Sequence, residues 1–266
     1  MISRLPGLSL PERAWGVVRR WALAWWRILY LGAVVLVLVL SPSSYGKVTR
    51  RALARHLYLD TAPVLLGFTV LAALISLVLT RIVVVTAISY GLSRYALEMV
   101  IRVLVLELIP LTAALFVAMR CTIPNGTQLA LLRQSGHLAR LSHAGADPIR
   151  VELLPRAVAG VFACITLAAL SCVVALVLAY LGVYGFSLAG LPSYTRMFGH
   201  VFAPAVTLVF VIKTVLFSLA VALIPMAAGL YDTGERTQPD SELGGLARMF
   251  AVLLLIEIGS LVGNYY

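Results

Sequence analysis

Residues 107–156 decide the fold of this chain: they read ELIPLTAALFVAMR over 107–120 and AGADPIRVELLPR over 144–156, with a turn-rich basic segment between them. The stretch begins inside one apolar run and ends where the next one starts. Its arginines are Arg120, Arg133, Arg140, Arg150 and Arg156, and isolated arginines are costly at membrane depth. Its central part is therefore predicted to lie outside the lipid, between two membrane-spanning helices, where a soluble partner can reach it.

The composition is that of an integral membrane protein. Of the 266 residues, 61% are hydrophobic and 12% are charged, and the mean hydropathy is +0.99. A soluble chain of this length could not bury so much apolar surface in one core. Because the apolar runs are long and lack the alternation of outer-membrane barrels, the predicted fold is all-α.

The net charge of +10 does not indicate nucleic-acid binding. The arginines cluster at the ends of apolar runs, as the positive-inside rule and anionic headgroups favour, and no basic run alternates with aromatic residues on a polar segment. Cys121, Cys164 and Cys172 have no CxxC spacing. Neither a disulfide framework nor a zinc site is therefore predicted.

Six apolar runs follow one another along the chain. A helix of about 20 residues crosses the hydrocarbon, and the last five runs are long enough to do so. The runs are Val17–Leu40, Ala62–Ile88, Ala96–Met119, Ala157–Tyr184, Val201–Leu230 and Leu246–Val262.

The first run is predicted to lie in the membrane interface, or to re-enter, instead of crossing. A crossing would separate Arg19 and Arg20 from Arg50 and Arg51 and leave no charge bias, against the positive-inside rule. Tryptophans beside arginines also suit headgroup depth. The chain is then one membrane domain (1–266) with its C-terminus outside: an interfacial helix in 1–40, spans 1–2 in 62–119, a cytoplasmic coupling segment with its own helix in 120–156, and spans 3–5 in 157–262.

Ionisable residues inside the spans are the candidate binding groups, because such groups are costly in lipid and usually functional. Glu98 and Arg102 are one turn apart with the acid first, and are predicted to pair near the outer interface. Glu107 lies deeper, three residues before Pro110, which should kink the helix and open space for a substrate headgroup. A structural hydrogen bond is the alternative role for Glu107.

Lys213 and Glu257 are two further ionisable residues inside apolar runs. Pairing between them would offset the cost of burying both charges, but the sequence does not place them side by side. Lys213 joins Glu98, Arg102, Glu107 and Pro110 as a candidate for a substrate cavity.

The segment after Met119 holds the candidate docking residues. Pro124-Asn125-Gly126 predicts a turn, residues 129–144 a short surface helix, and Asp147 with Pro148 the capped start of the next helix. We therefore expect a partner protein to dock on this segment, between two spans. The docking candidates are Arg133, His137, Leu138, Arg140, Leu141, Asp147 and Pro148.

The sequence contains no catalytic, nucleotide-binding or metal-binding pattern. It has no GxSxG, HExxH or Walker-type GxxxxGKS/T motif. His137 and His143, six residues apart, do not match the helical spacing of metal ligands and are predicted to be solvated loop residues. The chain is therefore not predicted to be an enzyme or to hold a metal or cofactor, and any energy source must be a partner or an ion gradient.

Five short motifs occur in one order along the chain: Leu106-Glu107-Leu108-Ile109-Pro110, Ala118-Met119-Arg120, Gly145-Ala146-Asp147-Pro148, Pro155-Arg156 and Ile212-Lys213-Thr214-Val215-Leu216-Phe217. They resemble the R-E-L-G-P, A-G-R, G-x-D-P, P-R and I-K-S-x-x-F motifs of the MlaE/YrbE family of ABC-transporter permeases. An interfacial helix followed by five spans is also that family's architecture. The chain departs from the family at Gln128, where an acid is usual, and at Gly136-His137, where the coupling helix usually carries a Glu-Gln pair.

The resemblance implies the membrane subunit of an MCE-type lipid transport system in the bacterial inner membrane. Such a permease is a homodimer that works with an ABC ATP-binding subunit inside, a periplasmic MCE-domain protein outside and a small STAS-domain subunit, and it moves phospholipid or a related lipid. Glu107, with Lys213 second, would then meet the lipid headgroup. The departures at the coupling helix imply a diverged ATPase partner or weaker coupling.

Three other functions remain open from the sequence. The chain could be a non-transporting scaffold that anchors an MCE protein, since it lacks the acidic coupling residues. It could be an ion-driven secondary transporter with Glu107, Lys213 and Glu257 as the relay, although it shows no inverted repeat. An intramembrane enzyme is least favoured, because no nucleophile and base occur together.

Overall fold

The computed structural model describes residues 10–42, 45–231 and 239–265, and every regular element in these ranges is helical. The elements are α1 (Leu10–Leu40), α2 (Lys47–Ser89), α3 (Ser93–Val100), η2 (Ile101–Leu108), α4 (Ile109–Val117), η3 (Ala118–Thr122), α5 (Ile123–Gln134), α6 (His137–His143), η4 (Ile149–Leu153), α7 (Leu154–Tyr184), η5 (Leu188–Gly190), α8 (Leu191–Val201), α9 (Pro204–Tyr231) and α10 (Pro239–Tyr265). The prediction of an all-α membrane protein is confirmed.

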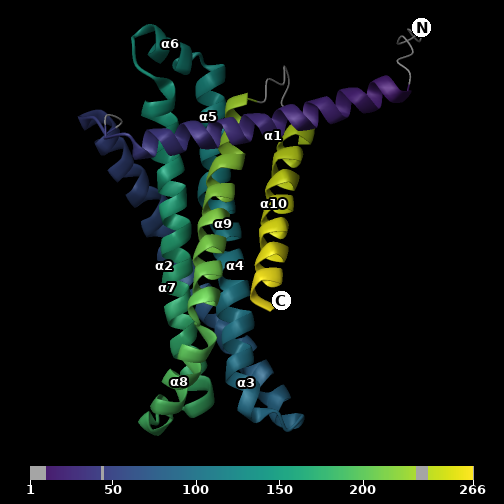
Figure 1. The fold of residues 1–266 in the computed structure, drawn as a ribbon. Helices are drawn as coiled ribbons and strands as arrows, with labels where there is room; N and C mark the ends of the chain where they lie inside the picture. Colours follow the sequence, from purple (N-terminus) through teal and green to yellow (C-terminus); the bar gives the residue numbers. More distant parts are fainter. Residues whose placement is uncertain (1–9, 43–44, 232–238, 266) are drawn as a thin grey trace.

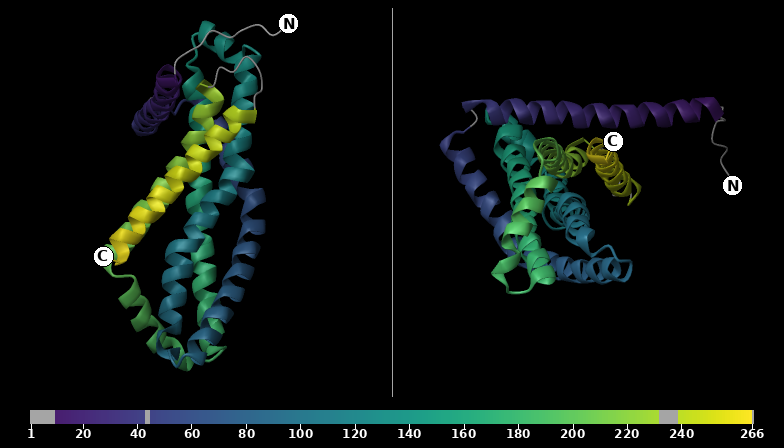
Figure 2. Two further views of the ribbon diagram at one scale, coloured as in Figure 1. Left: turned by 90° about the vertical axis from the view of Figure 1, so that its right-hand side faces the viewer. Right: turned by 60° about the horizontal axis from the view of Figure 1, so that its bottom comes forward.

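The long helices form a bundle, and α1 lies across one end of it (Figures 1 and 2). Six helices in the described ranges are long and apolar enough to cross a membrane. By its direction α1 is not one of the crossing set, as the charge distribution predicts. The end of the bundle that carries α1, α5, α6 and the start of α2 is named the basic end, because the arginines of the 120–156 segment gather there.

The first helix, α1, has two different faces, as an interfacial helix requires. Leu31, Val35 and Leu38 are buried, and their spacing of four and three residues forms one stripe that packs on α7 and α9. Trp21 and Trp26 are 60% and 69% exposed. An aromatic residue with a polar ring nitrogen is favoured at headgroup depth, so this face suits the membrane surface.

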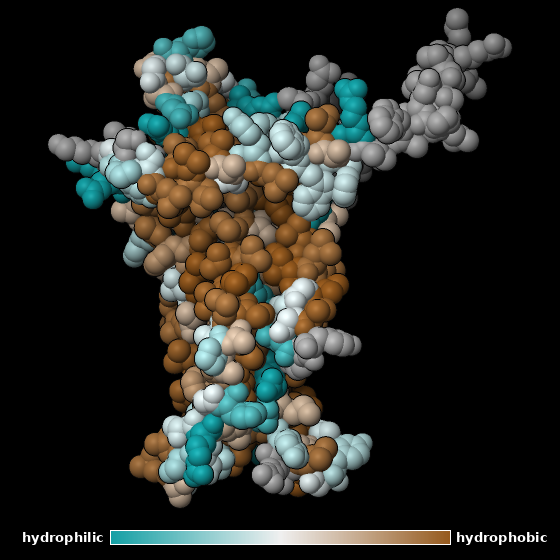
Figure 3. Space-filling model, in the orientation of Figure 1, coloured by the Kyte–Doolittle hydropathy of each residue, from teal (hydrophilic) through white to brown (hydrophobic). Residues whose placement is uncertain are grey.

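The crossing helices pack in sequence across the bundle: α2 on α7, α7 on α9 and α4, and α10 on α9. Phe68 and Phe217 are among the largest fully buried side chains of the core. The outer surface is brown, or hydrophobic, over the middle of the bundle and more hydrophilic at both ends (Figure 3). An apolar belt around a helical bundle is the surface expected for a protein in a bilayer.

Three π-helical stretches each end two residues before a proline. They are η2 before Pro110, η3 before Pro124 and η4 before Pro155. A proline has no backbone N–H to donate, and a wider turn lets neighbouring groups bond at a different spacing. These prolines therefore sit within continuous helices, and Pro110 is accommodated by η2 instead of ending a helix.

The structure differs from the sequence-based boundaries in several places. The predicted turn at Pro124–Gly126 is wrong, because α5 runs through it. The predicted surface helix over 129–144 is divided between α5 and α6 by Gly136, which has a positive φ of 70° that glycine adopts without strain. The helix start at Asp147 is confirmed, since Asp147 Oδ1 accepts from the Ile149 N–H at 3.0 Å.

One helix extends further than the hydropathy indicates, and one additional helix precedes α9. The span predicted from Ala62 begins at Lys47, so the basic residues before it are helical too. The segment before α9 contains α8, where burial raises the pKa of Tyr194 to about 12. The Tyr194 hydroxyl donates to the Leu176 carbonyl at 3.0 Å, which ties α8 to α7.

The crossing of α5 and α9 explains why Gly126 lies in a helix. A Cβ at Gly126 would stand 2.6 Å from the Pro225 carbonyl oxygen, and one at Gly229 would stand 2.2 Å from the Gly126 oxygen. Both obstacles are backbone atoms, which cannot rotate away. The two glycines let the helices approach closely, as small residues do between membrane helices.

Replacing Gly126 by alanine is expected to destabilise the protein by about 1–3 kcal/mol, the usual cost of overpacking. The measurement is thermal unfolding in detergent. Gly67→Ala is the matched control, since no atom lies within 4 Å of a Cβ there and alanine favours helix by about 0.5–1 kcal/mol. Equal melting temperatures for the two variants would contradict the close crossing.

Candidate functional site: a buried ion cluster and the coupling segment

Lys213 is the centre of a buried ion cluster inside the bundle. It lies on α9, and its side chain is only 1% exposed. Its ammonium forms an ion pair with Glu107 of η2 and a second with Glu257 of α10, at 2.9 Å. The second pair is a close charge contact without the geometry of a directed hydrogen bond. Tertiary packing thus joins three ionisable groups from three separate apolar runs.

Pro110 contributes to this cluster through the backbone. Since proline has no N–H, the Leu106 carbonyl, four residues earlier, lacks its usual helical donor. Lys213 Nζ donates to that carbonyl at 3.3 Å. The lysine therefore satisfies a buried backbone acceptor as well as two carboxylates, which reduces the cost of burying it.

Asn264 completes the cluster near the end of α10. Its amide donates to Glu107 Oε1 at 3.4 Å and approaches Ser260 Oγ at 3.5 Å. Its Oδ1 atom is buried and accepts no hydrogen bond. Asn264 was not among the candidate residues predicted from the sequence. The signal available there was its position seven residues, or about two helical turns, after Glu257.

The cluster holds one ammonium and two carboxylates, so its formal charge is −1 when all three groups are ionised. The carboxylate side chains are 12% and 14% exposed, and the Phe217 ring centroid is 5.7 Å from Lys213 Nζ. Charges in such an apolar environment interact more strongly than in water. The arrangement can attract a cation, a proton or a ligand that both donates and accepts hydrogen bonds.

The cluster lies about two helical turns inside the ends of α9 and α10 that point away from the basic end. Lys213 follows the start of α9 by nine residues, and Glu257 precedes the end of α10 by eight. At 1.5 Å per residue these positions are about 12–14 Å from those helix ends. Figure 1 shows that α10 ends at mid-height, while α3 and α8 extend further. The ion cluster is therefore covered by α10, which continues for about two further turns beyond it.

Glu98 and Arg102 form their own pair, separate from the contacts of the ion cluster. Arg102 Nε donates to Glu98 Oε1 at 3.1 Å, with both side chains about a quarter exposed. The predicted i,i+4 pair is confirmed. Their assignment to a substrate cavity stays a prediction.

The coupling segment is tied to the bundle by a second polar network. His137 Nε2, on α6, lies 3.6 Å from Glu152 Oε1, and Glu152 Oε2 accepts from Arg156 at 2.5 Å. The Arg156 side chain is 8% exposed and also donates to the Glu152 carbonyl at 2.6 Å. His137 is therefore not the solvated loop residue that was predicted, because it lies on a helix and faces a carboxylate.

Two further contacts hold the same end. Arg133 donates to the Leu230 carbonyl at 2.8 Å, close to the end of α9, where a cation is favourable. Asn125 donates to Asp60 at 2.9 Å, and the Cys121 thiol to the Asp60 carbonyl at 3.1 Å. Asp60 and Asn125 were not predicted to be site residues from the sequence. The available signal was that Asp60 is an acid directly before the first predicted span.

The docking candidates divide into inward and outward groups. Arg133, His137 and Leu138 contact the bundle, whereas Arg140 and Asp147 are exposed. Leu141 and Pro148 are half-buried. Of these residues, the exposed pair is the better placed to touch another protein. Over the described ranges no group of three His, Cys, Asp or Glu side chains could hold a metal ion.

A bundle of long apolar helices with a helical excursion outside the lipid defines a multi-pass membrane protein. The chain matches the family model described as Permease MlaE over residues 53–261. Since the match covers most of the chain, the protein belongs to the MlaE permease family. No curated protein sequence matches it. The recognition made from the five short motifs is confirmed.

Proposed function

We propose that this chain is the permease subunit of an ABC transporter that moves phospholipid or a related lipid between the inner and outer membranes of a bacterium. The observation that carries the proposal is the Lys213 cluster, a polar centre of mixed charge inside an otherwise apolar bundle. A lipid substrate needs an apolar path with a few polar groups for its headgroup. Lys213, Glu107 and Asn264 supply donors and acceptors in one place.

ATP hydrolysis belongs to a separate subunit in this proposal, and the 120–156 segment transmits it. The network from His137 through Glu152 to Arg156 links α6 to the start of α7. A displacement of α6 would therefore be transmitted to the membrane helix α7 through these charged contacts. The basic end faces the cytoplasm by the positive-inside rule, and an MCE-domain protein would meet the opposite end. A second copy of the chain and a small STAS-domain subunit complete the assembly.

The first test is purification of the chain from its native membrane in mild detergent, with mass spectrometry of the proteins that accompany it. An ABC ATPase in equal amount, together with an MCE-domain protein, is the expected result. An MCE-domain protein alone would favour a membrane scaffold. If neither protein is present, the ABC proposal is wrong.

One observation favours a second candidate, an ion-driven transporter. The three groups proposed for a relay, Glu107, Lys213 and Glu257, are in mutual contact through Lys213. Proton relays in membranes are built from such groups. Lipid transfer in proteoliposomes separates the two candidates: dependence on ATP supports the permease, and loss on adding a protonophore with ATP present supports the ion-driven transporter.

The Arg140→Glu substitution is expected to reduce lipid-stimulated ATP hydrolysis at least tenfold while the complex stays assembled. Arg140 is exposed on α6, and its described hydrogen bond, to the Ser135 carbonyl at 3.3 Å, stays within the coupling segment. Reversing its charge should therefore disturb a partner's surface and not the fold. The measurement is ATPase activity of the purified complex, with Arg19→Glu, exposed on α1, as control. Unchanged activity would exclude Arg140 from the docking surface.

A further inference from the structure

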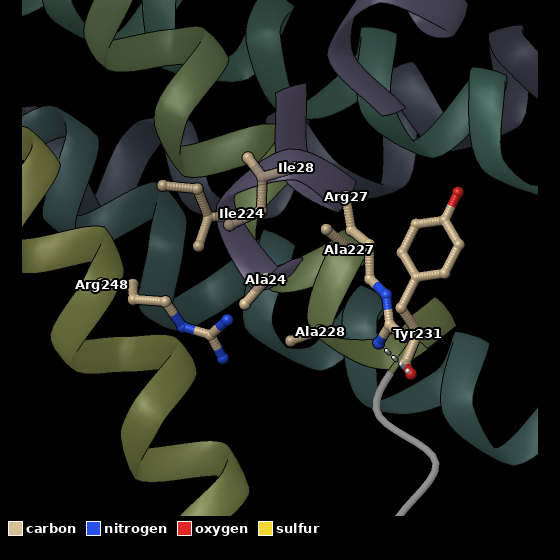
Figure 4. A pocket seen from close by; sticks show the side chains of 8 residues that line it. All are labelled: Ala24, Arg27, Ile28, Ile224, Ala227, Ala228, Tyr231 and Arg248. Atoms are coloured by element: carbon tan, nitrogen blue, oxygen red, sulfur yellow. Dashed lines mark hydrogen bonds between the residues drawn. The ribbon is translucent and has the colours of Figure 1, made fainter. Parts of the chain in front are cut away.

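The last helix, α10, is held to the bundle differently at its two ends. Near its start it packs on α9 around the small hollow drawn in Figure 4, where Arg248 of α10 and Ala228 of α9 line the same wall. Met249 of α10 is only 1% exposed and belongs to the apolar core. Towards the other end, Ile258 and Val262 are more than half exposed. The later turns of α10 therefore depend more on polar contacts, and the ion cluster supplies them.

Glu107 of η2 and Glu257 of α10 meet in that cluster. Both contact the Lys213 ammonium, and their carboxyl groups lie within hydrogen-bonding reach of one another. An ionised carboxylate accepts hydrogen bonds and has no hydrogen to donate. A close contact between two carboxyl groups is therefore favourable only when one of them carries a proton.

Lys213 compensates one of the two acids and not both. Its ammonium donates to the Glu107 carboxylate and to a backbone carbonyl, whereas its contact with Glu257 lacks the geometry of a directed hydrogen bond. Among the described residues, Lys213 and Glu107 are the charged groups that act on Glu257. Arg102, five residues before Glu107, is paired with Glu98. With both acids ionised, one negative charge would stay uncompensated in an apolar environment, where charge is costly.

Two buried acceptors of the cluster also lack a donor. Glu257 Oε2 and Asn264 Oδ1 are buried and accept no described hydrogen bond. A buried acceptor that has lost its water and found no donor is unfavourable. A proton on the acid pair supplies a donor at this place, and it needs no cavity of its own.

We infer that the Glu107–Glu257 pair holds one proton, which makes the Lys213 cluster neutral and joins α10 to η2. The proton belongs to the pair, because two acids in such close contact titrate together. Its loss would leave two carboxylates against one ammonium, and their repulsion would loosen the last turns of α10, a helix that packs mainly on α9. The role of this proton-dependent contact in lipid transport rests on the proposed function, whereas the presence of the proton does not.

The test is infrared spectroscopy of the purified full chain in detergent at about pH 8, where ordinary glutamates are ionised. The wild type is expected to show the carbonyl band of a protonated carboxylic acid. Glu257→Gln and Glu107→Gln should each remove one such band, since the remaining acid then pairs with Lys213 in its ionised form. Glu98→Gln, which alters an acid outside the cluster, is the matched control and should keep the band. Its absence from the wild type, or its survival in both cluster variants, would overturn the inference.

The dependence of stability on pH gives a second readout. The folded pair holds a proton that an ordinary glutamate of the unfolded chain releases by about pH 5. The folded state then binds more protons than the unfolded state, so stability is expected to fall as the pH rises from there. The folding equilibrium constant should decrease by up to about tenfold per pH unit until the pair releases its proton. Glu257→Gln should lack this fall and Glu98→Gln should keep it, and equal slopes in the wild type and Glu257→Gln would contradict the inference.

Added salts distinguish a proton from a metal cation. If sodium or potassium chloride stabilises the wild type but not Glu257→Gln, and no carboxylic acid band is present, a metal cation compensates the pair and the inference is wrong. These measurements need no lipid, ATP or partner subunit. Their failure would therefore leave the permease proposal standing, and the lack of an ATPase partner would leave the proton in place.

Discussion

The Lys213→Met substitution is expected to destabilise the protein by about 3–5 kcal/mol, the cost of removing one partner of a buried ion pair. It would leave the Glu107 and Glu257 carboxylates side by side with no positive charge, and the Leu106 carbonyl without its donor. The measurement is unfolding in detergent, monitored by temperature or denaturant.

A compensated variant separates stability from function. Lys213→Met combined with Glu107→Gln and Glu257→Gln removes all three charges, and replacing a buried ionic group with neutral residues of similar size is often close to neutral. The triple variant is therefore expected to regain most of the lost stability. If the cluster binds a headgroup or relays protons, the triple variant still transports no lipid. Full transport by a stable triple variant would show that the cluster is structural.

The Arg156→Gln substitution is expected to have the second largest effect, again about 3–5 kcal/mol. The Arg156 side chain is 8% exposed, and its guanidinium donates to both the carboxylate and the backbone carbonyl of Glu152. Without it, Glu152 stays partly buried with His137 as its remaining ionic contact. Thermal unfolding of the purified protein measures the loss.

The matched control lies one and a half turns earlier. Arg150 pairs with Asp147 at 3.6 Å, with both side chains more than 40% exposed, and such surface pairs contribute about 0–1 kcal/mol. Arg150→Gln should therefore leave stability nearly unchanged. A similar loss in both variants would mean that the Arg156–Glu152 contact has no special role.

A double substitution tests whether this network also transmits motion. Arg156→Met with Glu152→Leu removes both charges and should recover stability, but it also breaks the chain of contacts that leads from His137 through Glu152 to α7. Lipid-stimulated ATP hydrolysis is then expected to stay low in a stable protein. Recovery of that activity together with stability would show that Arg156 only stabilises the fold and does not position α6.

The first prediction rests on residues whose partners were hidden in the sequence, whereas Glu152 and Arg156 of the second are one helical turn apart. Glu107 and Lys213 stood out because ionisable residues in apolar runs are rare. Their common contact depends on how η2, α9 and α10 pack, and no spacing along the chain reveals that. Asn264 gave no signal besides its position about two helical turns after Glu257, since an amide near the end of the last span is ordinary. By contrast, Glu98 and Arg102 are one turn apart, and a local rule was sufficient to pair them.

The misplaced turn at Pro124–Gly126 has a similar origin. Proline, asparagine and glycine together favour a turn when only the local chain is considered. Here Gly126 is required because the backbone of α9 passes next to it, and η3 accommodates Pro124. Tertiary packing overrode local preference, as it commonly does.

The sequence by itself determined the membrane class, and it predicted the orientation and the place of the coupling segment. Those properties follow from hydrophobic length and from the distribution of arginine, which act residue by residue against a bilayer of fixed thickness. Only the tertiary structure decided which distant charges share a site: Lys213 with Glu107 and Glu257, and His137 with the local pair of Glu152 and Arg156. The first grouping depends on the packing of helices from distant parts of the chain, and the second on the contact between α6 and η4. Small residues such as Gly126 and Gly229 set how closely α5 and α9 approach.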